Sequence, residues 1–229
     1  MASAMWTTQQ QVQSRDGASP AKSASSADRI LNRAFDIVVA SALVVFLAPL
    51  LTVVALLVKM TSEGPVIFGH SRLGRDGQSF KCLKFRSMVV DSQARLAAHL
   101  AESAEARLEW ERDHKLRNDP RITPIGSFLR KSSLDELPQL FNVLRGDMSL
   151  VGPRPIVTEE VHRYGRYFSC YAQVRPGITG LWQISGRSDT TYRRRVALDV
   201  AYSRSQSLSL NVKILFMTVP SVMLAKGSR

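Results

Sequence analysis

The sequence predicts an α+β protein that is attached to a membrane near its N-terminus. An apolar run, Ile37–Val58, contains no charged residue. Two short strand-like runs, 65–68 and 80–85, lie on either side of the turn-forming residues Gly74–Gly77. Much of the remaining chain shows apolar residues at helical spacing. A membrane helix, a small hairpin and several helices together indicate a membrane-associated domain of mixed structure.

The chain is strongly basic. It has 229 residues, enough for one domain with a core, and its 31 Lys and Arg against 19 Asp and Glu give a net charge of +12. Such a surplus is typical of proteins with an anionic partner: nucleic acid, acidic lipid or a phosphorylated substrate. The two cysteines and four histidines show neither disulfide-framework nor zinc-site spacing. Composition therefore argues against a disulfide scaffold and against a zinc enzyme.

Composition and pattern divide the chain into four segments. Residues 1–28 are rich in Ser, Ala and Gln, which predicts a disordered tail. Residues 29–62 hold the membrane helix, and 63–206 the main folded domain. Residues 207–229 are apolar, but polar residues and a proline interrupt them, which favours an interfacial helix over a spanning one.

The apolar run has the length of a membrane span. Its 22 residues would measure about 33 Å as a straight helix, against a hydrocarbon layer of about 30 Å. Pro49 near its middle removes a backbone hydrogen bond and bends the helix. Arg29, Arg33 and Lys59 flank it on both sides, which favours keeping both ends in the cytoplasm. The residues alone leave two alternatives: a kinked spanning helix and a helix-break-helix hairpin in one leaflet.

Two adjacent carboxylates, Asp135 and Glu136, precede an apolar run with helical spacing that Gly146 is predicted to end. Either Ser133, in a capping box with Glu136, or Asp135 itself is expected to be the N-cap. Pro138 favours Asp135, because it would then be the third helical residue and cost little. Spacing alone favours this ordinary capping role, although a helix N-terminus also holds carboxylates ionised and binds phosphate.

A stiff turn follows this helix. Met148–Val151 is a strand-like run, and Arg154 then stands between Pro153 and Pro155. The prolines fix the neighbouring backbone, and a guanidinium on a stiff loop is suited to bidentate phosphate binding. A surface arginine without a role is the alternative interpretation.

The string from Asn118 to Arg154, NDPRITPIGSFLRKSSLDELPQLFNVLRGDMSLVGPR, closely resembles the core of the bacterial sugar transferases. These are monotopic polyprenyl-phosphate phosphoglycosyl transferases that begin exopolysaccharide assembly. The similarity extends to KFRSM at 84–88 and RPGITG at 175–180, and covers roughly residues 30–225. Within the family, the chain looks most like the small rhizobial galactosyl-phosphate transferases.

The resemblance implies a monotopic protein on the cytoplasmic face of the cell inner membrane. Its N-terminal helix would be a re-entrant helix-break-helix hairpin, and its cytosolic catalytic domain would carry interfacial helices. The family usually has Ser-Pro at the break, whereas this chain has Ala48-Pro49. Thr52, one turn later, is the candidate replacement for the missing hydroxyl.

The resemblance also implies a reaction. Hexose-1-phosphate would move from a UDP-sugar to undecaprenyl phosphate with release of UMP, as the first membrane step of exopolysaccharide biosynthesis. Galactose is favoured by the rhizobial likeness, with glucose and N-acetylated hexoses left open. The expected partners are the UDP-sugar, undecaprenyl phosphate and membrane lipids, with no nucleic acid; the oligomeric state is not predicted.

Matching positions imply the roles of individual residues. Asp135 is expected to be the nucleophile, forming a covalent aspartyl-phosphosugar intermediate, and to bind Mg²⁺. Glu136 is expected to shape the metal site or assist proton transfer. The expected phosphate-binding residues are Lys84, Arg130 and Arg154, and the expected nucleotide-binding residues are Arg175, Gly177 and Arg187.

Two other classes of function are compatible with composition alone. A membrane-tethered basic module that binds nucleic acid or lipid without turnover would show steep salt dependence. The chain lacks the interleaved aromatic and basic residues and the motifs typical of nucleic-acid binders. A scaffold for a polysaccharide export complex would tolerate substitution of its carboxylates.

Overall fold

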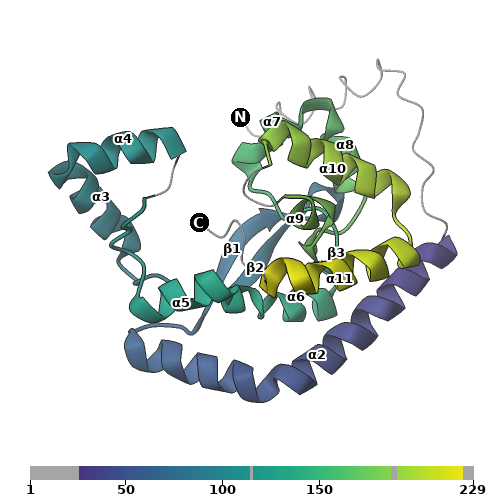
Figure 1. Cartoon of the computed structure of the whole chain (residues 1–229), viewed down its shortest axis with the longest axis horizontal. Helices are drawn as coiled ribbons and strands as arrows, with labels where there is room; N and C mark the ends of the chain where they lie inside the picture. The colour runs from purple at the N-terminus through teal and green to yellow at the C-terminus, as the bar shows by residue number, and fades with distance from the viewer. Residues whose placement is uncertain (1–25, 114–115, 187–189, 224–229) are drawn as a thin grey trace.

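The computed structural model describes residues 26–113, 116–186 and 190–223. Most of the predicted tail, 1–28, and Arg187 therefore lie outside the described residues. The elements are α2 (Ser26–Thr61), β1 (Ile67–Leu73), η1 (Arg75–Gly77), β2 (Ser79–Phe85), α3 (Ser92–Glu102), α4 (Ala104–Asp113), α5 (Pro124–Ser132), η2 (Leu134–Glu136), α6 (Gln139–Arg145), β3 (Ser149–Val151), η3 (Thr158–Glu160), α7 (Val161–Tyr164), η4 (Gly165–Tyr167), α8 (Phe168–Ala172), β4 (Gly177–Thr179), α9 (Leu181–Ile184), α10 (Tyr192–Ser205) and α11 (Leu208–Met223) (Figure 1). The predicted mixture of helices and strands is confirmed.

The long helix α2 lies along one side of the folded domain, below α5, α6 and α11 in the view of Figure 1. In its N-terminal arm, Arg33 donates to two consecutive backbone carbonyls of α6, at 2.6 and 3.0 Å. Asp36 accepts hydrogen bonds of 3.0 Å from the Ser149 hydroxyl and from the Leu150 N–H. These contacts fix the N-terminal arm of the helix to β3 and to the end of α6.

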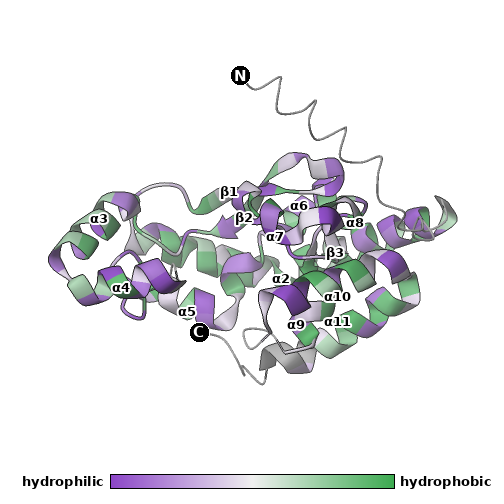
Figure 2. Ribbon diagram, turned by 90° about the horizontal axis from the view of Figure 1, so that it is seen from above, coloured by the Kyte–Doolittle hydropathy of each residue, from purple (hydrophilic) through white to green (hydrophobic). Residues whose placement is uncertain are grey.

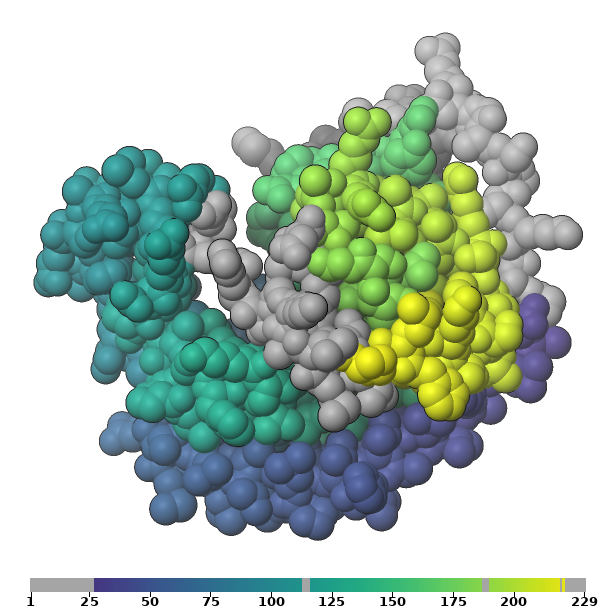
Figure 3. All heavy atoms as spheres, viewed as in Figure 1, coloured from purple at the N-terminus to yellow at the C-terminus, as the bar shows by residue number. Residues whose placement is uncertain are grey.

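The C-terminal arm of α2 packs against the same domain. Val54 and Val58 are buried in a cluster with Phe85 of β2 and Leu129 of α5. The opposite face of the helix is apolar and exposed, with Phe46 at 79% and Met60 at 82% of their full exposure. Figure 3 shows the side chains of α2 as a layer along the lower edge of the molecule. Of the described helices, α2 is the one long and apolar enough to cross a membrane.

Helix α2 continues through Pro49, so the predicted interruption into two helices is not confirmed. Figure 1 shows instead that the helix bends along its length. The Thr52 hydroxyl donates to the Ala48 carbonyl at 2.9 Å, four residues back, a bond that often accompanies helix bending. Proline and this back-bonding threonine together explain the curvature.

The predicted hairpin is confirmed, and its first strand runs further than expected. Strands β1 and β2 are antiparallel, with Phe68 opposite Lys84 and His70 opposite Cys82. Asn142 of α6 holds the other edge of β2: its side-chain oxygen accepts from the Leu83 N–H at 2.9 Å, and its amide nitrogen donates to the Lys81 carbonyl at 2.8 Å. The hairpin is thereby fixed to the helix that follows the two carboxylates.

The helical spacing of apolar residues over 90–116 predicts a single helix, but two helical segments, α3 and α4, form there. Ser103 between them has an extended backbone, and its hydroxyl accepts the Ala106 N–H at 3.1 Å. Serine favours such capping positions over helix interiors because its side chain competes for backbone groups. Figure 1 shows this pair of helices standing away from the rest of the molecule.

A second small sheet joins β3 and β4. The strand predicted at 148–151 is confirmed as Ser149–Val151. Residues 177–179, within a glycine-containing segment that predicts a loop, form its parallel partner. The run Leu181–Ile184, whose sequence predicts a short strand, is the short helix α9. Its Trp182 is buried, so tertiary packing has overridden the strand propensity of a four-residue segment.

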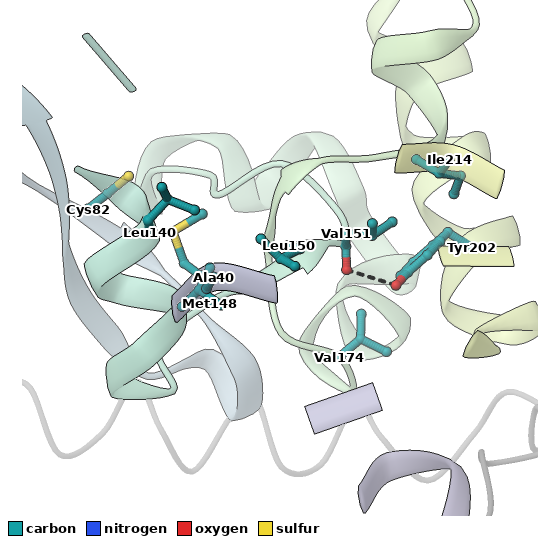
Figure 4. Close-up of a cluster of buried hydrophobic side chains, with 10 residues drawn as sticks. Ala40, Cys82, Leu140, Met148, Leu150, Val151, Val174, Tyr202 and Ile214 are labelled. Atoms are coloured by element: carbon teal, nitrogen blue, oxygen red, sulfur yellow. Dashed lines mark hydrogen bonds between the residues drawn. The ribbon is translucent and has the colours of Figure 1, made fainter. Parts of the chain in front are cut away.

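The main core lies between α2, the two sheets and the C-terminal helices. Figure 4 shows Cys82, Leu140 and Met148 at one end of this cluster, and Tyr202 and Ile214 at the other. The Tyr202 hydroxyl donates to the Val151 carbonyl at 2.8 Å. The predicted C-terminal helix is confirmed as α11, which Figure 2 shows to be largely hydrophobic.

Candidate active site

Asp135 and Glu136 lie in η2, a single 3₁₀ turn between α5 and α6. Both predicted N-caps are wrong: α6 begins at Gln139 with Pro138 as its N-cap, and no side chain caps it. The reason is Ser133, whose φ of 58° is left-handed and reverses the chain after α5. The turn directs Asp135 into the protein. At the other end of α6, Gly146 ends the helix as predicted.

Lys84 of β2 faces the two carboxylates. Its Nζ donates to Glu136 Oε1 at 2.6 Å and lies 3.8 Å from Asp135 Oδ2. The Asp135 side chain is 10% exposed, whereas the side chains of Lys84 and Glu136 are 30% and 40% exposed. We call these three residues the carboxylate–lysine group. Lys84 thus pairs with both carboxylates, closely with Glu136 and at a longer distance with the buried Asp135.

The environment acts on Asp135 in two opposing ways. Burial raises the pKa of its carboxyl above the usual value, and the neighbouring charge of Glu136 raises it further. Lys84 is the largest influence that lowers this pKa, followed by Arg130, but the net direction is upward. Burial thus disfavours the ionised form of this carboxyl, and a bound cation would favour that form.

Arg130 approaches the group from the last turn of α5. Its Nε donates to the Ser87 hydroxyl at 2.8 Å, which fixes the guanidinium. Burial lowers the pKa of Arg130, and the charge of Asp135 raises it. The structure therefore brings four of the predicted residues together: Lys84, Arg130, Asp135 and Glu136.

Arg154 lies in the loop after β3, with its guanidinium 5.9 Å from the centroid of the buried Trp182 ring. The Gly177 N–H donates to the Pro153 carbonyl at 2.8 Å, which fixes the loop that carries Arg154. The charges of Lys84, Glu136, Arg72 and Arg154 all influence the pKa of the buried Cys82 thiol, which burial raises. The charges of Arg154, Lys84 and Glu136 therefore act on the same position of β2.

Two predicted nucleotide-binding residues have other contacts. Arg175 donates through Nε to the Gly146 carbonyl at 2.8 Å, at the end of α6, and its electrostatic neighbours include Arg33. Gly177 lies in β4, and a side chain there would overlap the backbone of Gly152. In the described residues, neither contacts the carboxylate–lysine group.

The structure also adds two residues that the sequence did not indicate. Arg72 donates to the Pro155 carbonyl at 3.3 Å, and the nearby charge of Arg154 contributes to lowering its pKa. Asp199 of α10 is buried, accepts the Tyr164 hydroxyl at 2.7 Å, and has its pKa raised to about 7 by burial. The charge of Arg154 opposes that increase. A single aspartate in a mixed-charge helix carries no sequence pattern that marks it.

The donor set limits how a metal ion could bind. In the described ranges, no group of three or more His, Cys, Asp or Glu side chains is placed to hold one. Asp135 and Glu136 offer two carboxylates, both within ion-pair distance of Lys84. Mg²⁺ in phosphoryl-transfer sites commonly uses one or two carboxylates together with substrate phosphates. The residues fit an ion that shares its ligands with a bound diphosphate.

Comparison with known proteins identifies a family and several relatives of this chain. The family model for "Bacterial sugar transferase" matches residues 27–225. An "Undecaprenyl-phosphate galactose phosphotransferase" of Salmonella typhimurium is 50% identical over 206 residues, which are 90% of this chain and 43% of that protein. The "Exopolysaccharide production protein ExoY" of Rhizobium meliloti is 47% identical over 196 residues, which are 86% of this chain and 87% of that one.

A third relative differs in the sugar that its name contains. The "UDP-glucose:undecaprenyl-phosphate glucose-1-phosphate transferase" of Escherichia coli is 41% identical over 203 residues, covering 85% of this chain and 40% of that protein. The chain thus spans less than half the length of several relatives and most of the length of others. On the match over 27–225, this chain belongs to the bacterial sugar transferase family.

Proposed function

We propose that this protein transfers galactose-1-phosphate from UDP-galactose to undecaprenyl phosphate, with release of UMP, as the first membrane step of exopolysaccharide biosynthesis. The observation that carries the proposal is the buried Asp135 beside Lys84, within the electrostatic reach of Arg130. The names of the Salmonella and Rhizobium relatives support galactose and exopolysaccharide.

The chemical problem is the approach of one anion to another. A carboxylate that attacks a diphosphate needs nearby positive charge, which Lys84 and Arg130 supply from fixed positions. A bound Mg²⁺, held by Asp135 and by the free oxygen of Glu136 together with the diphosphate, would add further screening. Glu136 meanwhile holds the Lys84 ammonium between the two carboxylates.

The reaction proceeds in two displacements at one phosphorus. An oxygen of Asp135 attacks the phosphorus that bears the sugar, and the bond to the UMP oxygen breaks, with its electron pair leaving on UMP. A phosphate oxygen of undecaprenyl phosphate then attacks the same phosphorus, and the bond to Asp135 breaks, which regenerates the carboxylate. No net proton is taken up or released, and one site serves a soluble donor and a lipid acceptor in turn.

We further propose that α2 enters and leaves one leaflet of the inner membrane, so that the active site lies at its cytoplasmic surface. Both arms of the bent helix pack on one folded domain, and its outward face is exposed and apolar. Phe85, which packs against α2, is the immediate neighbour of Lys84. Lys84 of the active site is therefore adjacent in the sequence to a residue that packs against the helix proposed to face the membrane.

The substrate proposal is tested with purified protein, undecaprenyl phosphate, Mg²⁺ and a panel of radiolabelled UDP-sugars. We expect UDP-galactose to give lipid-linked label and UMP at least about tenfold faster than UDP-glucose or the N-acetylated UDP-sugars. Chelation with EDTA should stop the reaction, and added Mg²⁺ should restore it. Faster transfer of another sugar would overturn the assignment of galactose. Lipid binding without UMP release from any sugar would overturn the enzymatic proposal.

The membrane arrangement is tested by labelling single cysteines at the two ends of α2. In a variant with Cys82 and Cys170 replaced by serine, cysteine is placed at Ala27 or at Glu63, both exposed. We expect a membrane-impermeant maleimide to label both positions in inside-out vesicles and neither in right-side-out vesicles. Labelling of one position from each side would instead establish a spanning helix. Cys170, retained alone, reports the side on which the folded domain lies.

A further inference from the structure

We propose that His70 is a further substrate-binding residue, which binds a phosphate group between Lys84 and Arg72. The inference rests on the proposed function and adds to it a residue that the sequence patterns did not indicate. The phosphate belongs either to the nucleotide sugar or to the lipid acceptor, and the experiment below separates these two sources.

The strand register places His70 on the active-site face of the hairpin. Residues directly opposite each other in an antiparallel pair have side chains on the same face, and alternate residues along a strand share a face. Phe68 is opposite Lys84, His70 opposite Cys82, and Arg72 opposite Phe80. His70 therefore lies between Arg72 and Lys84 on one face, and we call these three residues the cation row.

The row connects the two parts of the candidate site. At one end, Lys84 contacts Asp135 and Glu136. At the other, Arg72 donates to the Pro155 carbonyl beside Arg154. A group bound along the row would reach from the nucleophile to the proline-flanked arginine, with His70 at the middle. This is where a diphosphate that spans the site would lie.

The contacts of His70 leave it available for a ligand. Its ring stacks on Phe68, with 6.1 Å between ring centroids, which fixes the plane of the imidazole. Its Nδ1 is buried, with no hydrogen-bond partner in the described part of the chain. A buried ring nitrogen without a partner costs free energy that a bound oxyanion or hydroxyl would recover. The fold alone gives no reason for this unsatisfied nitrogen.

The charges around His70 favour an anion. Arg72 on its own strand and Lys84 on β2 share its face, Lys81 acts from the other face of β2, and the carboxylate of Glu159 in η3 opposes them. Burial and these cations lower the pKa of His70, which favours the neutral imidazole in the free protein. A bound phosphate offsets the cations and stabilises the imidazolium, so binding should draw a proton onto the ring.

The first test separates donor from acceptor by kinetics. His70→Ala is expected to raise the KM of one phosphate substrate about tenfold, with kcat and the other KM changed less than about threefold. A rise for UDP-galactose identifies the donor phosphate, and a rise for undecaprenyl phosphate identifies the acceptor phosphate. Lys81→Ala is the matched control: it removes an exposed cation on the opposite face of β2 and should change neither KM.

The second test does not depend on turnover. UDP binding is measured by calorimetry in two buffers of different ionisation enthalpy, which reports protons taken up. If the row binds the donor, the wild-type protein takes up a proton and His70→Ala does not. His70→Gln, which keeps a polar side chain but cannot titrate, should recover part of the affinity without proton uptake. If the KM rise concerns the acceptor instead, short-chain polyprenyl phosphate replaces UDP as the probe.

The proposal is overturned if His70→Ala folds with an unchanged melting temperature, keeps both KM values within about threefold, and takes up the same number of protons. If the wild-type protein shows no turnover but takes up a proton that depends on His70, the proposed function is contradicted. The phosphate site is supported in that case. The two failures are therefore distinguishable.

Discussion

Replacement of Asp135 by asparagine is expected to lower the rate of UMP release about 10³-fold or more, with donor binding changed only a few-fold. The amide has nearly the shape of the carboxylate but cannot attack phosphorus. Asp135 is buried and has a raised pKa, so removing its charge costs the folded state little. The loss of activity should therefore appear in a well-folded protein with an unchanged or higher melting temperature.

Trapping of the intermediate identifies the nucleophile directly. With labelled UDP-galactose and no acceptor, the wild-type protein should retain label in stoichiometric amount, and hydroxylamine, which cleaves acyl phosphates, should release it. Asp135→Asn should retain none. Glu136→Gln is the matched control: it neutralises the adjacent carboxylate and should slow the reaction while keeping the label. Label retained in Asp135→Asn and lost in Glu136→Gln would exchange the roles of the two residues.

Replacement of Lys84 by methionine should lower activity about 10²-fold at pH 7, and more at lower pH. Lys84 is the largest influence that holds down the pKa of Asp135, against burial and Glu136. Without the ammonium, that pKa rises further, and a larger fraction of Asp135 is protonated at any given pH. The acid limb of the pH–rate profile should therefore move to higher pH, and part of the lost activity should return under alkaline conditions.

The measurement is kcat/KM for UDP-galactose between pH 5.5 and 9 in the wild-type protein, Lys84→Met and Lys84→Arg. Arginine keeps the charge, so its profile should keep the acid limb of the wild type even if the rate is lower. Lys81→Met supplies the control for removing a cation from the same strand. A loss of equal size at every pH in Lys84→Met would mean that Lys84 only binds substrate and does not set the ionisation of Asp135.

The parts of the fold that could be predicted depend on local chemistry. Gly146 ends α6 because a left-handed residue is needed there, and glycine tolerates that conformation. The turn at 74–77 joins the two predicted strands for a similar reason. Where the prediction of the start of α6 was wrong, the deciding feature is one that no pattern in the sequence indicates. Ser133 adopts a positive φ, which a serine rarely does, so no sequence rule places the start of α6 at Gln139.

In the candidate site, too, some features could be predicted from local sequence and others could not. Asp135 and Glu136 are adjacent in the sequence and can be recognised there as a pair. Lys84, which contacts them, lies 52 residues before Glu136, so no motif spacing could predict this contact. The family resemblance supplied Lys84, Arg130 and Arg154. Neither source indicated His70, because its significance lies in the register of two strands and in the charges across it.

The side chain of Asn142 has a consequence beyond holding the hairpin to α6. A strand edge with free N–H and C=O groups is a template on which another chain can add a strand. The amide of Asn142 occupies both kinds of group on the outer edge of β2, at Leu83 and Lys81. Copies of a protein concentrated on a two-dimensional lipid surface meet often, and one buried asparagine removes these two bonding positions from any strand-to-strand aggregation.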